Sequence, residues 1–237
     1  MSVQAFKNVI LQRLHPEVIG RLDLQRVELP VNREIEFPGN GIAHLFFIED
    51  GIASMTVTFK DGFEVEVALG GPESILGTSC MMGTRRSLNR VYMQIGGYGY
   101  SSVMEVATKE FKRGEQFHDL TLRYLQAQFI QSAQTAGCNA HHNIEQRMAR
   151  WLLLCSDRVG DRVLPLSHEY MADMLGVTLS SVTVVAGHLQ ERGLIQYTRG
   201  KITLLDLAGL EAISCECYRV VRDHLRSLAD FEETYGG

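Results

Sequence analysis

The segment 166–205 constrains the fold of this chain more than any other. It reads LSHEYMADMLGVTLSSVTVVAGHLQERGLIQYTRGKITLL, with apolar residues at helical spacing on both sides of Gly176. Ala172 is small enough to let two backbones approach, Gly176 suits a tight turn, and Val182 would fill the angle between two helices. This pattern predicts a helix-turn-helix, in which two short helices cross steeply.

The second helix of such a motif enters the major groove of DNA, so the pattern predicts a protein that reads a gene's control region. Val182, Val185 and Leu189 would share the face that packs inward. At about 100° per residue, the face expected to point into the groove is the opposite one. It comprises Ser180, Thr183, Val184 and Gly187.

The residues around the two helices fit this interpretation. Ser167 and Thr178 are good N-caps for the first and second helix, and Gly193 suits the end of the second. Residues 195–204 then read as two short strands around an Arg199-Gly200 turn. They predict a wing with a basic tip that could contact phosphate.

Length and composition allow one large or two ordinary domains, since the chain has 237 residues and 45% apolar content. No apolar run reaches the roughly 18 residues of a membrane span. Residues 1–16 read as an amphipathic helix without a signal-peptide cleavage site. The five cysteines are scattered and odd in number, which favours reduced thiols. We therefore expect a cytoplasmic protein with no membrane partner.

The charge balance complicates the DNA-binding prediction. The formal net charge is −5, and neither half of the chain is basic, whereas DNA-binding proteins usually carry a basic surface. Binding would have to depend on a local basic patch. One alternative is therefore a sensor or interaction protein of the same fold with weak or lost specific DNA binding. An enzyme is not expected, because the sequence has no nucleophile elbow, P-loop or HExxH motif.

Residues 33–107 change to a period of two, which is typical of strands. Apolar residues alternate with polar ones over 55–69 on both sides of a Lys60-Asp61-Gly62 turn, and further strands are predicted at 44–48, 91–95 and 101–106. Many glycines lie between these strands, which favours a small antiparallel barrel or roll. Residues 1–30 before it are predicted to be helical.

From about residue 109 the period is helical, and no proline or glycine interrupts residues 117–136. A narrow stripe along this helix ends in small residues and predicts a dimer interface. The alternative is a helix that packs only on its own roll. A second helix, 143–155, follows a hinge at 137–143. The stripe consists of Leu122, Leu125, Phe129, Ser132 and Ala136.

Three segments carry a resemblance to a known family. LFFIEDGIASMTVTFKDGFEVEVALGGPESILG resembles the cyclic-nucleotide-binding-type roll of the Crp/Fnr family of bacterial transcription regulators. HHNIEQRMARWLLLCSDRVG, the segment 166–205 and LAGLEAISCECYRVVRDHL resemble an alpha-proteobacterial subgroup of that family. The resemblance implies an α+β chain with an effector-sensing roll (1–116), a dimerisation helix and hinge (117–142) and a winged helix-turn-helix domain (143–237). It also implies a homodimer on a palindromic operator, and a contact with RNA polymerase.

In members like the catabolite activator, the recognition helix carries Arg, Glu and Arg where this chain has Leu179, Ser180 and Val184. The two-pronged arginine contact to guanine is therefore absent here. Hydroxyl groups could still bind bases or phosphates, and Val184 could touch a thymine methyl group. The resemblance places Ser167 and His168 against phosphate. The DNA-binding candidates are Ser167, His168, Thr178, Leu179, Ser180, Ser181, Thr183, Val184, His188, Arg199 and Lys201.

The resemblance also suggests an effector site at Gly77, Thr78, Arg86 and Ser87. Thr78 stands where cyclic-nucleotide-binding members have a glutamate, which disfavours a cyclic nucleotide. Another anionic effector, an apolar effector or none remains open, and so does the identity of any cofactor.

No cysteine precedes Cys80, so the N-terminal iron–sulfur cluster of the Fnr branch has no ligands here. Cys215 and Cys217 resemble a metal-binding pair, but residues two apart on one helix point in different directions. We therefore expect them to be buried core cysteines and expect no metal site. Haem binding through one of four histidines stays open as an alternative: His44, His118, His141 and His142.

Overall fold

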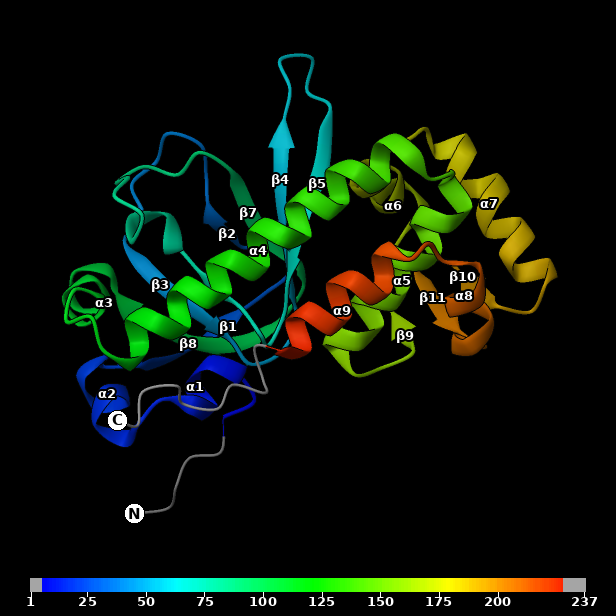
Figure 1. Cartoon of the computed structure of the whole chain (residues 1–237). Helices are drawn as coiled ribbons and strands as arrows, with labels where there is room; N and C mark the ends of the chain where they lie inside the picture. Colours follow the sequence, from blue (N-terminus) through cyan, green and yellow to red (C-terminus); the bar gives the residue numbers. More distant parts are fainter. Residues whose placement is uncertain (1–5, 228–237) are drawn as a thin grey trace.

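The N-terminal half of the chain is an antiparallel roll of two four-stranded sheets (Figure 1). The computed structural model describes residues 6–227. Apolar residues from both sheets fill the space between them, and the predicted roll and α+β class are confirmed. The first sheet has the order β1 (Gln25–Leu29), β8 (Gly97–Val103), β3 (His44–Ile48), β6 (Ile75–Leu76). The second has the order β2 (Glu34–Glu36), β7 (Arg90–Ile95), β4 (Ile52–Thr58), β5 (Glu64–Gly70).

Glycine is required where β3 turns into β4. Gly51 has a φ of 93°, and a Cβ there would lie 2.5 Å from the carbonyl oxygen of Ile95. A Cβ on Gly97 would lie 2.1 Å from the carbonyl oxygen of Asp50. Both distances are too short for any side chain, so the two glycines let the corner of the roll close.

The β4–β5 hairpin projects beyond the roll (Figure 1). Its alternating apolar and polar residues do not correspond to alternating buried and exposed side chains. The pairing register shifts between Met55 and Thr56, which is a β-bulge. Thr56 and Glu66 are consequently buried, whereas Phe59 and Phe63 near the tip are about half exposed.

Two predicted boundaries are wrong. Residues 1–30 are not one helical region, because Pro16 starts a second short helix and β1 follows it. The strand predicted at 101–106 ends at Val103, where the chain turns into a helix. These helices are α1 (Val9–Arg13), α2 (Pro16–Arg21) and α3 (Met104–Phe111).

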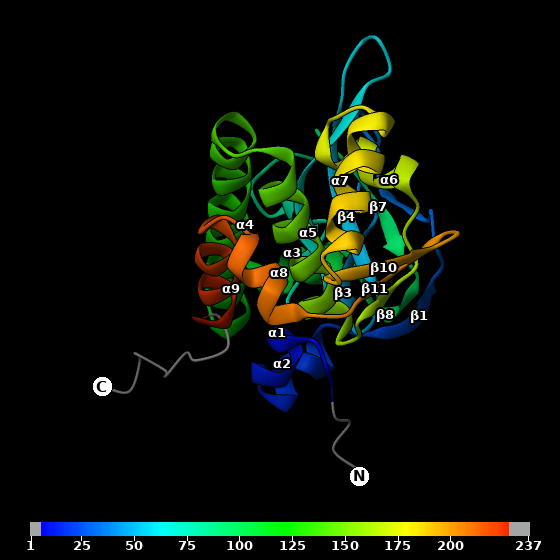
Figure 2. The same ribbon diagram turned by 90° about the vertical axis from the view of Figure 1, so that its right-hand side faces the viewer.

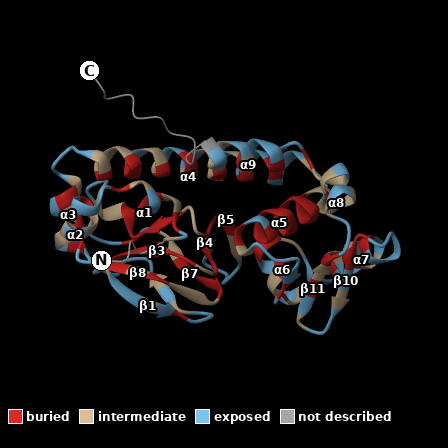
Figure 3. Ribbon diagram, turned by 90° about the horizontal axis from the view of Figure 1, so that it is seen from below, coloured by how far each residue is buried: buried red, intermediate tan, exposed pale blue. Residues whose placement is uncertain are grey.

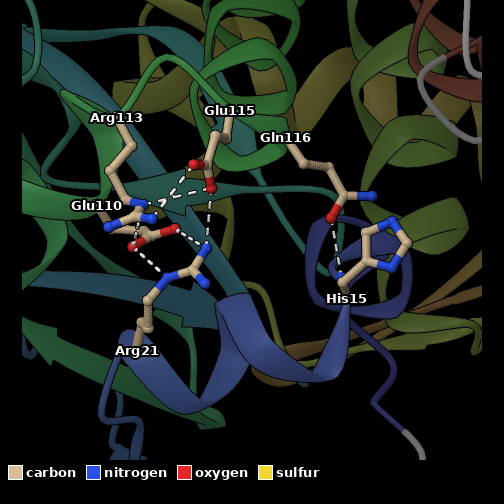
Figure 4. A network of polar contacts seen from close by, with 6 residues as sticks. All are labelled: His15, Arg21, Glu110, Arg113, Glu115 and Gln116. Atoms are coloured by element: carbon tan, nitrogen blue, oxygen red, sulfur yellow. Dashed lines mark hydrogen bonds and ion pairs between the residues drawn. The ribbon is translucent and has the colours of Figure 1, made fainter. Parts of the chain in front are cut away.

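Polar contacts fasten the N-terminal helices to the start of the long helix α4 (Gln116–His141), as Figure 4 shows. The guanidinium of Arg21 donates to both carboxylate oxygens of Glu110 at 2.7 and 2.8 Å, and it also reaches Glu115. The Gln116 side chain accepts from the His15 amide and donates to the Arg13 carbonyl, both at 2.8 Å. These contacts fix where α4 leaves the roll.

The C-terminal region packs beside the roll and under α4 (Figures 1 and 2). Met148, Trp151, Leu152 and Cys155 are buried as predicted. Helix α9 lies against α4 (Figure 3) and begins at Cys217, so the expectation that Cys215 and Cys217 share one helix is wrong. The elements are α5 (Ile144–Val159), β9 (Val163–Leu164), α6 (His168–Leu175), α7 (Leu179–Glu191), β10 (Ile195–Thr198), β11 (Lys201–Leu204), α8 (Leu207–Ile213) and α9 (Cys217–Ser227).

Within residues 6–227, no single helix is long and apolar enough to cross a membrane, and α6 with α7 meets that criterion only as a pair bent by 110°.

Roll and C-terminal region meet at a buried carboxyl group. Glu66 on β5 accepts from the indole nitrogen of Trp151 on α5 at 2.8 Å, and its other oxygen lies 2.6 Å from the Ser54 hydroxyl. That hydroxyl also lies 2.8 Å from the Gln94 amide oxygen. One hydroxyl proton cannot serve both oxygens. A protonated Glu66 resolves the conflict by donating to Ser54, which then donates to Gln94.

Burial raises the pKa of Glu66 from 4.5 to about 7, against the opposing effect of hydrogen bonds from Ser54 and Trp151. Between these pH values the folded protein keeps a proton that the unfolded chain has lost. Glu66 should therefore lower the free energy of unfolding by about 1.4 kcal/mol per pH unit as the pH rises through that window.

A Glu66→Gln variant should lack this contribution, because an amide does not ionise. Urea unfolding from pH 5 to pH 8 should show the stability of the variant rising relative to the wild type. Glu105→Gln, at an exposed position of α3, serves as the control and should follow the wild type. Parallel pH profiles for wild type and Glu66→Gln would contradict the prediction.

Candidate DNA-binding surface and effector cavity

Helices α6 and α7 form the predicted helix-turn-helix. They are bent by 110° at a turn where Gly176 has a φ of 62°. Ala172 and Val182 are both buried, as the spacing predicts. A Cβ on Gly176 would lie 2.9 Å from the Val65 side chain of the β4–β5 hairpin. Glycine therefore serves both the turn and the close approach of the roll.

The outer face of α7 is open. Ser180, Thr183 and Val184 are exposed, with Val184 at 57%, whereas Val182 and Leu189 are fully buried. Leu179 at the start of the helix is also exposed, at 44%. No described part of the chain covers the face predicted to enter a major groove.

Three hydroxyl groups gather at the N-terminus of α7. Thr178 caps the helix by accepting from the Ser181 amide at 3.3 Å. Its hydroxyl oxygen lies 2.9 Å from that of Ser180 and 2.8 Å from that of Ser181. The cluster presents polar groups at the positive end of the helix dipole, where a DNA phosphate is favoured.

His168 is turned toward the protein. Its ring stacks on Tyr197 of the wing with centroids 3.9 Å apart, and Nδ1 lies 3.3 Å from the Thr183 hydroxyl. Burial lowers the pKa of His168, so the neutral ring is favoured near pH 7. The structure therefore gives this side chain a positioning contact between α6, α7 and the wing. Sequence reasoning missed Tyr197, which has no motif of its own.

The remaining DNA-binding candidates surround α7. The Ser167 hydroxyl caps α6 by accepting from the Tyr170 amide at 3.1 Å. His188, Arg199 and Lys201 are exposed, the last two beside the turn of the β10–β11 wing, where Gly200 has a φ of 75°. These side chains are free to meet phosphates on either side of a groove.

The predicted effector residues meet around a carboxylate that sequence reasoning missed. Glu36 accepts from the Gly77 amide at 2.9 Å and from the Ser87 hydroxyl at 2.7 Å. Burial raises the pKa of Glu36, while these two hydrogen bonds oppose the rise. Arg86 is exposed and donates to the Gly39 carbonyl, so it does not join them. An internal carboxylate thus occupies the donors that an anionic effector would need.

A cavity of about 280 Å³ lies beside Glu36, between the roll and α4. Met55, Leu76 and Met82 give it a largely apolar wall, and Thr78 adds a buried hydroxyl. Helix α4 contributes Leu125, Gln128, Phe129 and Ser132.

The predicted dimer stripe runs along the outer side of α4. Phe129 is 74% exposed and Leu122 is 46% exposed, and Ala136 is exposed as well. Leu125 and Ser132 are half-buried because they also line the cavity. The inner face, which includes Tyr124, Ala127 and Gln131, is buried on the roll. The helix thus buries one side on its own roll and leaves the other side exposed (Figure 3), where Leu122 and Phe129 lie.

Comparison with known proteins supports this assignment. Residues 146–213 match the family model of the Crp-like helix-turn-helix domain. Residues 146–213 therefore form a Crp-like helix-turn-helix domain. A global nitrogen regulator of the cyanobacterium Nostoc sp. is 27% identical over 183 residues, covering 73% of this chain and 82% of the relative. This relative gives no support to the alpha-proteobacterial subgroup, which stays a prediction.

Two solved structures share the fold of this chain. FixK2 from Bradyrhizobium japonicum has a TM-score of 0.71 at 15% identity and covers 82% of this chain and 98% of its own. A Crp/Fnr-family regulator from Eubacterium rectale has a TM-score of 0.68 at 20% identity, and the match covers 86% of this chain and 96% of the other.

Proposed function

We propose that the protein is a transcription regulator of the Crp/Fnr type, which acts in the cytoplasm as a homodimer and binds a two-fold-symmetric operator under the control of its roll. The observation that carries this proposal is the double role of α4. Its outer stripe is largely apolar and partly exposed, and three residues of that stripe, Leu125, Phe129 and Ser132, also line the cavity against the roll. A ligand in the cavity would therefore act directly on the dimer interface.

The proposed dimer would place two copies of α7 in successive major grooves, about 34 Å apart. Without arginine at the reading positions, specificity would come from hydroxyl groups and from Val184 against a thymine methyl group. Arg199 and Lys201 would supply charge to the phosphates on each side. Contact with RNA polymerase belongs to the same proposal, since a regulator acts on transcription.

We also propose that the effector is uncharged and largely apolar. Half of the residues that line the cavity are apolar, namely methionine, isoleucine, leucine and phenylalanine, and the other half are polar and include Glu36. The Glu36 carboxylate already holds the Gly77 amide and the Ser87 hydroxyl. A cyclic nucleotide would have to displace this carboxylate or place its phosphate against it. Ligand entry would shift α4 and rotate the two recognition helices relative to each other.

Phe129→Glu should weaken the dimer, because it places a charge in the middle of the apolar stripe. Sedimentation should show a shift from dimer to monomer, and a gel shift on the regulator's own promoter should show a loss of the specific complex. Lys109→Glu, at an exposed position of α3, is the matched control. A monomeric Phe129→Glu protein with unchanged operator affinity would separate dimerisation from DNA binding and refute the proposal.

Replacing Arg199 and Lys201 by Ala should lower DNA affinity equally for specific and non-specific sequences. The double variant loses two phosphate contacts per protomer and therefore four per dimer, which should reduce the slope of log K against log salt concentration by about 4. Filter binding at several salt concentrations measures this slope. Lys60→Ala with Lys112→Ala removes the same charge from exposed positions of the roll and should leave the slope unchanged. An equal loss of slope in both double variants would show that only net charge matters.

Isothermal titration with cyclic AMP should give no binding heat for the wild-type protein, because the Glu36 carboxylate occupies the necessary donors. A neutral apolar fluorescent probe should bind, and Thr78→Phe should block it by filling the cavity. Saturable cyclic AMP binding would contradict the proposed effector class and leave the dimer proposal intact.

A further inference from the structure

Four potential metal ligands meet where α4 ends, in a region that the DNA-binding surface and the effector cavity do not use. Cys138 and His142 come from the end of α4, and Cys215 and Cys217 come from the junction of α8 and α9. Their ligand atoms all lie within 4.8 Å of one another. The three cysteines are at most 2% exposed, and the His142 side chain is 10% exposed.

The distances fit four-coordinate binding, and Cys138 and Cys215 are not joined by a disulfide. The Cys138 and Cys215 sulfurs are 3.5 Å apart, and the Cys217 sulfur lies 3.6 Å from Nδ1 of His142. A disulfide would need about 2.05 Å. With zinc–sulfur bonds of about 2.3 Å and zinc–nitrogen bonds of about 2.1 Å, tetrahedral geometry places neighbouring ligand atoms roughly 3.5–3.8 Å apart.

Groups around the cluster orient the ligands. Nε2 of His142 lies 3.3 Å from a carboxylate oxygen of Glu216, so Nδ1, on the other side of the ring, is free to face the sulfurs. A carboxylate on the second nitrogen is a common support for a metal-bound histidine. The side-chain amide of Gln134 donates to the Cys217 sulfur at 3.0 Å, which suits a thiolate.

Two buried arginines lie next to the cluster. Arg147 and Arg150 are at most 8% exposed, and the Nε of each has no hydrogen-bond partner within the described residues. Arg147 interacts electrostatically with Cys138 and Cys215, and Arg150 interacts electrostatically with Cys138. A site of three thiolates and one imidazole around a divalent ion carries a net charge of −1. That charge would help to balance the two buried guanidinium groups.

We propose that Cys138, His142, Cys215 and Cys217 bind one zinc ion. The donor set is the Cys₃His set of structural zinc sites, and thiolate and imidazole ligands select zinc over magnesium or calcium. All four ligand positions come from the protein and the site is closed to solvent, so the ion has a structural role. It joins the end of α4 to α9 and thereby fixes the C-terminal region on the long helix.

The sequence gives an incomplete signal for this site. Cys138 and His142 are four residues apart and share one face of a helix, which is a usual ligand spacing. Cys215 precedes α9 and Cys217 begins it, so the bend between α8 and α9 turns both sulfurs to the same side. If Cys215 and Cys217 are assumed to lie on one helix, their sulfurs are expected to point in different directions, and the site is missed.

The test uses the full-length protein, purified under reducing conditions without chelators and then saturated with Zn²⁺ and desalted. Plasma mass spectrometry should find one zinc per chain. Replacement with Co²⁺ should give the absorption of a tetrahedral thiolate site, including sulfur-to-cobalt charge transfer. Cys217→Ser should lose the zinc and most of the charge-transfer band, whereas Cys80→Ser, which alters a half-buried thiol of the roll, should keep both.

A chelator should lower the melting temperature of the wild type and of Cys80→Ser, with a much smaller shift for Cys217→Ser. Circular dichroism checks that each variant is folded. If Cys217→Ser fails to fold, the cobalt spectrum of the wild type decides alone. The proposal is overturned if the reduced wild type retains no zinc, if cobalt gives no sulfur charge transfer, or if iron–sulfur absorption appears instead. None of these results bears on DNA binding, so failure here is distinct from failure of the proposed function.

Discussion

The position of the recognition helix depends on how the C-terminal region is held against the roll, and Arg158 of α5 joins it both to the roll and to α4. Its guanidinium donates to Glu73 of the roll at 2.8 Å and to the side-chain oxygen of Gln131 on α4 at 2.7 Å, and it also reaches the Leu154 carbonyl. The side chain is almost fully buried. Removing Glu73 would leave a buried charge without its carboxylate partner, so this contact resists displacement.

The same interface also contains a buried carboxyl group, that of Glu66, whose ionisation would destabilise it. Glu66 is buried between Trp151 and Ser54, and this burial raises its pKa. A carboxyl group there is most stable when protonated. The interface thus combines one firmly paired cation with one carboxyl group that prefers to be neutral, and mild changes of condition act on the second.

The sequence predicts what local patterns specify. The Ala172, Gly176 and Val182 spacing, the caps at Ser167 and Thr178, and the core positions of α5 are all confirmed, because each depends on residues a few positions apart. Glu36, Tyr197 and the cysteine cluster could not be predicted in the same way. Each acquires its role from partners 29 to 77 residues away, as in the pairing of Tyr197 with His168 or of Cys215 with Cys138.

Helix α4 makes three separate sets of contacts at different points along its length. Near its start it is fixed to the N-terminal helices by Gln116, at mid-length it lines the cavity through Phe129, and at its end Cys138 meets α9. A rigid helix transmits a shift at one point to the other points along its length, because its backbone hydrogen bonds resist bending. The hinge after His141 is adjacent to the cysteine cluster. A zinc ion bound there would stiffen the end of α4, so that a movement of α4 would be passed on to the C-terminal region instead of being absorbed in the turn between α4 and α5.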